Sequence, residues 1–273
     1  AADRLAETAD AAGILTFATL AEFDGGPVQA GGFWDEARSE WFNRFAGRSD
    51  RSATYRFIAP HVRGQVLEIG PGPGAYTRHL VAAADRVVAV EPSPHMARLL
   101  RQNLQPCPNL VVVECAIEDY LPCLESYDLA LAANVLESVE RIDEVIGAVS
   151  AHSRVLSIVT WANAITPPWL LAVQRELLGQ TQPRPNAPDN QALLAVLDEL
   201  GLTYEVHDPA LPIHTFACMD DLVAWVEGFV GLDPAHREPL THILAPYVSV
   251  KDGRLGLPRG QASIVVNVYR ARC

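Results

Sequence analysis

From residue 65 onward, short apolar runs rich in β-branched residues alternate with segments of helical periodicity. Five runs have the length of buried strands, at residues 65–69, 86–90, 110–113, 127–132 and 154–159. Helical patterns separate them, as in residues 139–149, where Val and Ile recur every three or four positions. Near-continuous apolar strands that alternate with helices require a parallel sheet covered on both faces. We therefore predict an α/β fold with a doubly wound sheet, because such crossovers are right-handed.

Composition and charge narrow the class of protein. Hydrophobic residues make up 49% of the 273 residues, as in a globular chain, and no uninterrupted apolar stretch reaches the roughly 18 residues of a membrane span. The net charge is -12 without a run of Lys or Arg, so we expect no nucleic-acid partner. Five cysteines without a C-x-x-C pair indicate neither a disulfide framework nor a zinc site, which predicts no metal, reduced thiols and a cytoplasmic protein.

A glycine-rich loop at residues 70–75 is the most informative motif. Its sequence, Gly-Pro-Gly-Pro-Gly-Ala, lies where the strand 65–69 should end and a helix begin. Glycines there let the backbone turn tightly and approach a ligand, and ligands of doubly wound sheets bind at the carboxyl ends of the strands. Glu91, at the end of the second strand, lies 21 residues after Gly70 and can accept hydrogen bonds from both hydroxyls of a ribose.

Two kinds of cofactor compete for this loop. Gly70, Gly72 and Ala75 also satisfy the dinucleotide pattern G-x-G-x-x-A. However, the carboxylate of Glu68 would face the place of a pyrophosphate, where like charges repel. It suits a ligand with a cationic amine instead. S-adenosylmethionine carries an α-ammonium, a sulfonium and a ribose but no phosphate, so Glu68 and Glu91 favour it over NAD or FAD.

The pattern Glu68-x-Gly70-x-Gly72-x-Gly74 resembles motif I of the class I S-adenosylmethionine-dependent methyltransferases. Residues 90–96 resemble the motif that follows it, and residues 127–137 resemble the fourth-strand motif. The resemblance implies a Rossmann-like, mostly parallel seven-stranded sheet whose last strand runs antiparallel. It also implies that the glycine loop wraps the methionine part of the cofactor, that Glu91 binds the ribose, and that Met96 packs near the adenine.

Two positions depart from the family pattern. Ala116 stands where the family usually has an Asp near the adenine, so Glu118 or the main chain of Ala116 and Ile117 would serve instead. Ser138 stands where relatives often have a His. The residues expected to bind the cofactor are Glu68, Gly70, Gly72, Gly74, Glu91, Pro92, Met96, Ala116, Ile117, Glu118 and Asn134, with Asn134 near the sulfonium.

The chain divides into three parts on this interpretation. Residues 1–62 form an N-terminal helical cap segment, and residues 63–160 form the S-adenosylmethionine-binding Rossmann-like core. Residues 161–273 complete the core with helical cap insertions and the antiparallel strand. Residues 161–202 and 209–262 are longer than minimal crossovers, which indicates a cap that determines substrate choice.

Methyl transfer needs orientation and desolvation, and it needs a general base only if the acceptor must lose a proton. Glu137, after the fourth strand, and His214, in the late region, are the candidate catalytic groups. The aromatic candidates for binding the acceptor are Trp34, Trp41, Tyr55 and Trp161, and Trp161 is expected to follow the fifth strand directly.

We expect an S-adenosylmethionine-dependent methyltransferase with a small-molecule acceptor, because Asn134-Val-Leu-Glu137 lacks the Asn-Pro-Pro-aromatic motif of enzymes that methylate bases. A binding protein that holds the cofactor without catalysis is an alternative, as is the transfer of another group from the same cofactor. A nicotinamide-dependent oxidoreductase is a third alternative. Tyr247 and Lys251 do spell its Y-x-x-x-K pair, but β-branched neighbours and a following Asp-Gly turn argue against the necessary helix.

Overall fold

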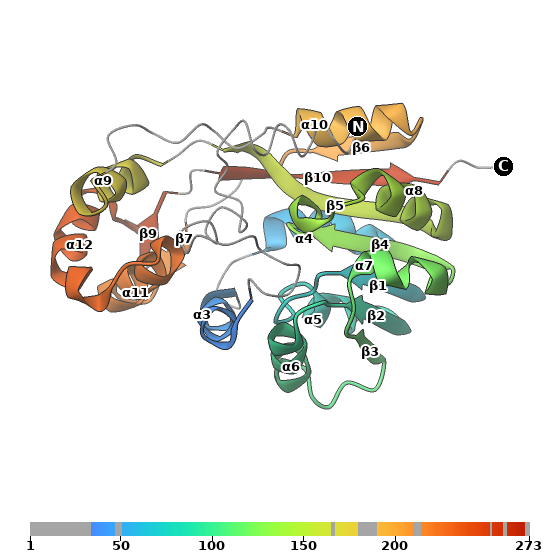
Figure 1. Cartoon of the computed structure of the whole chain (residues 1–273), viewed down its shortest axis with the longest axis horizontal. Coiled ribbons are helices and arrows are strands. Elements are labelled where there is room, and N and C mark those ends of the chain that lie inside the picture. The colour runs from blue at the N-terminus through green and yellow to red at the C-terminus, as the bar shows by residue number, and fades with distance from the viewer. Residues whose placement is uncertain are drawn as a thin grey trace.

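The computed structural model describes residues 34–46, 51–164, 167–179, 190–209, 214–251, 253–258 and 261–270. It therefore does not address the part of the predicted N-terminal cap segment that precedes residue 34. Within the described residues, the chain forms a large sheet with helices on both faces and a smaller unit to one side of it (Figure 1).

Seven strands form the large sheet, in the order β3-β2-β1-β4-β5-β10-β6. Their bounds are β1 Gln65–Ile69, β2 Arg86–Val90, β3 Leu110–Val113, β4 Tyr127–Ala133, β5 Ser153–Ala164, β6 Thr203–His207 and β10 Gln261–Tyr269. The pairs from β3 to β5 are parallel, and β10 runs antiparallel to both β5 and β6. The predicted mostly parallel, Rossmann-like sheet with an antiparallel last strand is confirmed.

Helices cover the two faces because alternate strand residues point in opposite directions. Val66, Val87 and Leu129 pack on one face with α4 and α5, whereas Leu67, Val88 and Ala130 pack on the other with α7, α8 and α10. The helical elements around the large sheet are α4 Ser52–Ile58 and η2 Ala59–His61 before β1, and α5 Thr77–Leu80, α6 Pro94–Asn103, α7 Ile117–Tyr120, η3 Leu121–Cys123, η4 Leu136–Ser138, α8 Ile142–His152 and α10 Gln191–Glu199 between the strands.

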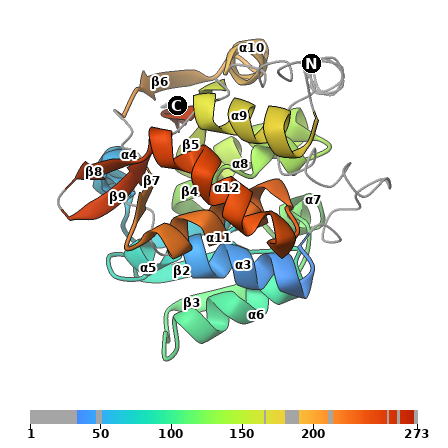
Figure 2. The ribbon, with the colours of Figure 1, turned by 90° about the vertical axis from the view of Figure 1, so that its left-hand side faces the viewer.

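A second unit, which we call the cap, lies beyond the carboxyl ends of the parallel strands (Figures 1 and 2). It contains α9 Pro168–Leu177, α11 Met219–Val230, η5 Pro234–His236, α12 Arg237–Leu244, η6 Ala245–Tyr247 and a three-stranded sheet of β7 His214–Phe216, β9 Arg254–Leu257 and β8 Ser249–Lys251. Trp169, Leu222 and Leu240 belong to its own apolar core. Sequence analysis predicted helices here but missed the small sheet.

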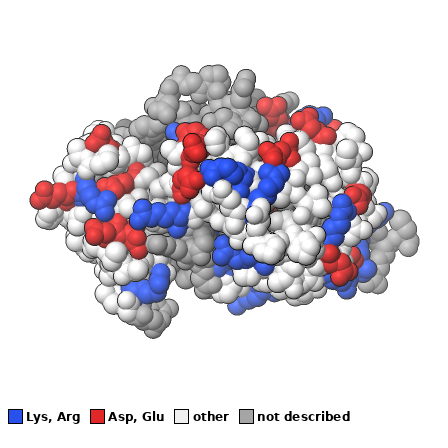
Figure 3. Space-filling view, turned by 90° about the horizontal axis from the view of Figure 1, so that it is seen from below, with Lys and Arg blue, Asp and Glu red and all other residues white. Residues whose placement is uncertain are grey.

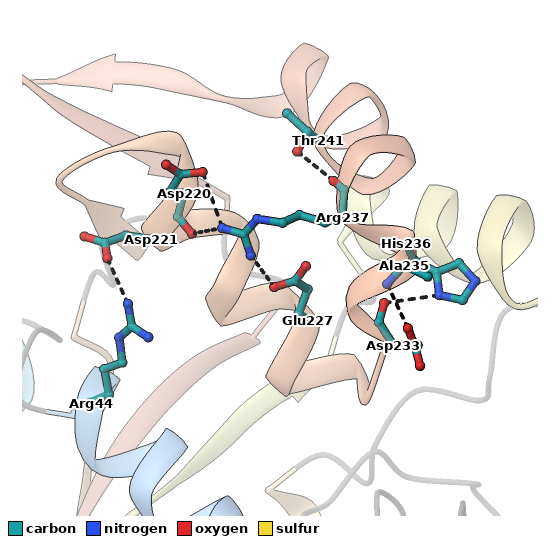
Figure 4. A network of polar contacts seen from close by, with 9 residues as sticks. All are labelled: Arg44, Asp220, Asp221, Glu227, Asp233, Ala235, His236, Arg237 and Thr241. Atoms are coloured by element: carbon teal, nitrogen blue, oxygen red, sulfur yellow. Dashed lines mark hydrogen bonds and ion pairs between the residues drawn. The ribbon is translucent and has the colours of Figure 1, made fainter.

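An arginine joins the helices α11 and α12 of the cap (Figure 4). Arg237, at the start of α12, donates to Glu227 Oε2 at 2.6 Å and to Asp220 Oδ1 at 3.3 Å, and both acids lie on α11. Asp233 stabilises the turn before α12 by accepting from the backbone N–H of Ala235 at 2.7 Å. These bonds fix the angle between α11 and α12.

Two predictions concern the later strands. The expectation that Trp161 follows the fifth strand is wrong, because β5 continues to Ala164 and Trp161 pairs with Ser263 within the sheet. The long partner β10 extends the pairing past the end of the apolar run. The Y-x-x-x-K pair does not lie on one helix: Tyr247 lies in η6 and Lys251 in β8, before a turn at Gly253.

Helix α3 (Glu36–Ala46) contacts both the core and the cap. On the core side, Arg98 of α6 pairs with Glu40 at 3.0 Å. On the cap side, Arg44 pairs with Asp221 at 3.6 Å, and the Trp41 indole packs directly on Gly228 of α11. Because the contact reaches the glycine's backbone, a side chain at position 228 would collide with the indole.

We expect Gly228→Ala to destabilise the protein by about 1–3 kcal/mol, since overpacking displaces Trp41 or separates α3 from α11. Gly147→Ala is the matched control, because Gly147 is also helical and its added methyl would meet only Leu200 at 4.0 Å. That control should gain about 0.5–1 kcal/mol from helix propensity. Urea unfolding measures both, and equal stability gains in the two variants would refute the packing of Trp41 on α11.

Candidate functional site

The glycine loop leaves the carboxyl end of β1 with three residues in left-handed backbone conformations. Gly70, Gly72 and Gly74 have φ values of 61°, 54° and 95°. A Cβ at Gly70 would collide with Val135, and one at Gly74 would lie 2.8 Å from Leu100. At Gly72 only Phe42 of α3 lies within range, at 3.8 Å. The outer glycines are therefore required for packing, and Gly72 presents open backbone on the side of α3.

Glu91 is held in a single orientation directly after β2. Its side chain is buried, with Oε2 accepting from the Gly72 N–H and Oε1 from the Ser93 N–H, each at 3.0 Å. Burial raises the pKa of this carboxyl, and the bonds from Ser93 and Gly72 oppose that rise. A carboxylate oxygen accepts two hydrogen bonds, so each oxygen keeps one acceptor direction for a ligand. Two parallel acceptors at the end of β2 fit a ribose diol.

Ser93 connects this carboxylate to two helices. Its hydroxyl accepts from the Met96 N–H at 3.3 Å and so caps α6, while it donates to the backbone oxygen of Trp34 at 3.3 Å, next to α3. Sequence analysis did not select Ser93. The signal was present, because Ser followed by Pro94 is typical of a helix start, with Ser as the cap and Pro at the first position.

Glu68 is a buried carboxylate with unused hydrogen-bonding capacity. Its side chain is 2% exposed in β1, and Oε2 has no hydrogen-bond partner among the described residues. Burial raises its pKa to about 7 and the nearby charge of Glu91 adds to that rise, whereas the hydroxyl of Thr77 and the charge of Arg51 oppose it. A buried acceptor without a donor costs free energy, so this oxygen indicates a ligand that brings a donor. An ammonium group supplies both the donor and the compensating charge.

Asn134 contributes a second unpaired acceptor at the end of β4. Its φ of 52° places it in the left-handed region, and its backbone N–H donates to Val159 O at 2.8 Å. Within the described part of the chain, its buried Oδ1 has no partner. Asn tolerates this conformation better than most residues, and such outliers gather at functional sites. The amide therefore lies at the same edge of the sheet as Glu68 and the glycine loop.

The residues expected near the adenine lie at the adjoining strand ends. Ala116 directly precedes α7, which begins at Ile117 after β3. The Glu118 carboxylate accepts from the Glu140 N–H at 3.2 Å, which connects this turn to the segment after β4. Pro92 is exposed, whereas Met96 is only 1% exposed in α6. These assignments, like those of Glu68, Gly70, Gly72, Gly74, Glu91 and Asn134, stay predictions.

The aromatic residues predicted to bind the acceptor fall into separate places. Trp34 and Trp41 flank Phe42 on the α3 segment, with ring centroids 5.1 and 6.4 Å from it. Tyr55 lies instead against His79, with ring centroids 4.8 Å apart and its hydroxyl donating to the His79 oxygen at 3.3 Å. Trp161 lies in β5, and its side chain is outside the description.

The two candidate catalytic groups are less defined. Glu137 lies in η4 after β4, but its side chain is not among those described. His214 lies in β7 of the cap, with its ring centroid 4.4 Å from that of Trp225. Both roles stay predictions.

In the described ranges, no group of His, Cys, Asp and Glu is placed to hold a metal ion, and no helix is long and apolar enough to cross a membrane.

Comparison with known proteins identifies the core. Residues 67–157 match a family model described as "Methyltransferase domain". This part of the chain is therefore a methyltransferase domain, which confirms the resemblance to the class I S-adenosylmethionine-dependent methyltransferases and the cofactor that it implies. The YcgJ protein of Bacillus subtilis (TM-score 0.51, 15% identity) and a putative methyltransferase from Bacillus halodurans (0.52, 14%) share the fold, and each match covers 82% of this chain and all of the other.

Curated relatives correct one expectation. The chain is 46% identical over 55 residues to a probable ribosomal RNA small subunit methyltransferase A of Methanopyrus kandleri, and 34% identical over 98 residues to the corresponding enzyme of an Anaeromyxobacter strain. These matches cover 20% and 36% of this chain, and 20% and 34% of the relatives' lengths. The exclusion of nucleic acid as a partner, which rested on net charge, is thus wrong. Net charge averages over the whole chain and says little about one binding face.

Glu68 generates a pH-dependent prediction. With a pKa of about 7, Glu68 is mostly protonated in the free protein at pH 6 and mostly ionised at pH 8. A ligand ammonium beside it favours the carboxylate, so binding should release this proton at pH 6. Affinity should rise from pH 6 to about pH 7, before the α-ammonium of the ligand begins to lose its own proton. Calorimetry with S-adenosylmethionine in buffers of different ionisation enthalpy measures the release.

The release at pH 6 should disappear in Glu68→Gln, whose amide cannot lose a proton. Glu144→Gln is the control, because Glu144 is an exposed acid paired with Arg141 on α8. Proton release that is the same in wild-type protein and Glu68→Gln would show that Glu68 does not meet the cationic end of the cofactor.

Proposed function

We propose that this protein transfers a methyl group from S-adenosylmethionine to an acceptor bound between the carboxyl ends of the strands and the cap. One observation carries the proposal: two buried carboxylates flank the glycine loop, one fixed by two backbone donors and one with an unpaired oxygen. Glu91 matches a ribose diol, and Glu68 matches an α-ammonium. The same pair opposes a dinucleotide, whose pyrophosphate would lie against Glu68.

The chain's own residues supply orientation and a dry environment. S-adenosylmethionine, when bound, supplies an electrophilic methyl group on a sulfonium. Glu91 would hold the ribose, Glu68 the ammonium, and Asn134 would present its amide beside the sulfonium. Helix α3 and the cap lie over this edge of the sheet and would limit the access of water (Figure 2). Orientation and desolvation of this kind account for much of the acceleration of a displacement.

Two classes of acceptor have separate support. The names of the curated relatives favour ribosomal RNA. The aromatic rings of α3 and the absence of an Asn-Pro-Pro-aromatic motif after β4 favour a small molecule. On the face in Figure 3, arginines alternate with acids. Arg98 pairs with Glu40 and Arg101 with Glu114, and both arginines stay partly exposed. The four described cysteines are free thiols, which supports a cytoplasmic location as part of the proposal.

Binding of the cofactor is the first test. Calorimetric titration should detect binding of S-adenosylmethionine and of its demethylated product, and no binding of NAD. Glu91→Gln should weaken both affinities by about 1–3 kcal/mol, because it removes charge and sets an amide against backbone donors. Glu125→Gln, at an exposed acid paired with Arg86, should leave them unchanged. Unchanged affinity in a folded Glu91→Gln protein would remove the ribose assignment, and binding of NAD alone would favour an oxidoreductase.

Transfer of a labelled methyl group distinguishes the acceptors. The protein is incubated with S-adenosylmethionine labelled in its methyl group, together with either small-subunit ribosomal RNA or a low-molecular-weight metabolite extract. Label in the RNA would support the function of the relatives, and label in the extract would support a small molecule. A second incubation uses cofactor labelled in its carboxyl carbon, and label that is transferred only from that carbon would reveal a different transferred group. Tight cofactor binding without transfer of either label would favour a non-catalytic binding protein.

A further inference from the structure

A row of aromatic rings and arginines crosses α4 and continues onto the elements on either side of it. On one side, the ring of Tyr55 lies 4.8 Å from that of His79 in α5. On the other side, Phe57 stacks on His207 of β6, with ring centroids 4.5 Å apart and 12° between the planes. We call this row the arginine–aromatic band, and its members are Tyr55, Arg56, Phe57, Arg78, His79 and His207.

The two arginines of the band are held in place without an acidic partner. The Arg56 guanidinium lies over the ring of Phe57, 4.6 Å from the centroid, and Arg78 Nε donates to Gly74 O at 3.3 Å. Both side chains are exposed, and neither forms an ion pair within the described ranges. Arg98 and Arg101, by contrast, pair with carboxylates at 3.0 and 2.6 Å. Arg56 and Arg78 therefore keep N–H donors for a ligand, and such donors suit a phosphate.

Positive charge gathers at the end of the band beside the glycine loop. Burial lowers the pKa of His79, and the charges of Arg78 and Arg51 lower it further, so both guanidinium groups act on this place. The acid Glu205 lies at the opposite end, 3.8 Å from His207 Nε2. An anion would thus be attracted to the part of the band where α5 leaves the glycine loop.

Rings and guanidinium groups in one row fit a strand of unpaired nucleotides. Bases stack on aromatic and guanidinium planes, while arginines bind the phosphates between them. His79 is exposed and Tyr55 is half-buried, so both rings are accessible from solvent. A duplex offers only its phosphates to such a surface, because its bases are already stacked on one another. The extent of the band over α5, α4 and β6 suits a polymer better than a single small anion.

We propose that the arginine–aromatic band binds a single-stranded segment of RNA. Arg56 and Arg78 would contact phosphates, and Tyr55 and His79 would stack on bases where the strand approaches the glycine loop. The proposal rests on the proposed function and deepens it, because it assigns a surface to the RNA acceptor. It also gives Tyr55, which sequence analysis selected for acceptor binding, a role outside the space between α3 and the cap.

Fluorescence anisotropy with labelled RNA at several salt concentrations tests the band. Wild-type protein should bind a single strand of about 12 nucleotides more tightly than a duplex of the same length. Arg56→Gln should weaken binding and reduce the slope of log affinity against log salt by about 0.7, the value for one phosphate contact on a single strand. Arg141→Gln is the matched control, because Arg141 is an exposed arginine that pairs with Glu144 at 2.7 Å. It should change neither quantity.

A ring variant separates stacking from charge. Tyr55→Leu should weaken binding of the single strand about tenfold, because stacking of one base is lost, and should leave the salt slope unchanged. Tyr55→Phe keeps the ring and should keep the affinity, although it loses the hydroxyl that donates to the His79 oxygen. Calorimetric titration of each variant with S-adenosylmethionine shows whether the glycine loop next to the band has kept its structure.

Equal affinity of wild-type protein for single strand and duplex, or an unchanged salt slope in Arg56→Gln, would overturn the proposed surface. Cofactor binding without any RNA binding would also overturn it, and would leave the proposed function with a small-molecule acceptor. RNA binding that shows both variant effects in a protein that does not bind the cofactor would support the band and overturn the proposed function.

Discussion

The carboxylate of Glu91 is the interaction on which the site depends. Its two oxygens accept from Gly72 and Ser93, so one side chain fixes the glycine loop after β1 relative to the turn after β2. Ser93 then carries this order to α6 and to Trp34 beside α3. The same group that would recognise the ribose therefore also organises the backbone around it. Recognition of a ribose and the conformation of the glycine loop therefore both need a buried carboxylate at this position.

Buried, incompletely paired polar groups at this edge of the sheet lower the stability of the ligand-free protein. Glu68 is almost completely enclosed, and its raised pKa measures how much the environment disfavours the carboxylate. Arg51 and Asn134 add further unpaired polar atoms. Groups with strained or unsatisfied arrangements are typical of sites that are completed by a ligand. The distribution of these atoms is more informative than the fold, because many unrelated activities share this sheet.

Sequence reasoning succeeded where burial dictates the residue pattern. The strands 65–69, 86–90 and 110–113 were predicted with their observed bounds, because a fully buried parallel strand is a short continuous apolar run. It failed for β7 and β8, since three residues carry no measurable periodicity. It also failed for the end of β5, which the partner strand β10 determines. Glu68 and Glu91 were selected from their spacing, but the contact of Ser93 with Trp34 arises only in the tertiary structure.

The position of β10 determines when the large sheet can be completed during synthesis of the chain. This strand is later in the sequence than any other of the large sheet, yet it lies between β5 and β6 and bonds to both. Asn267 within it also contacts Ser157 of β5 and the Phe57 oxygen of α4. Until residues 261–269 leave the ribosome, β5 and β6 expose unpaired edges of the kind that promote aggregation. The nascent chain is thus most vulnerable just before its sheet closes.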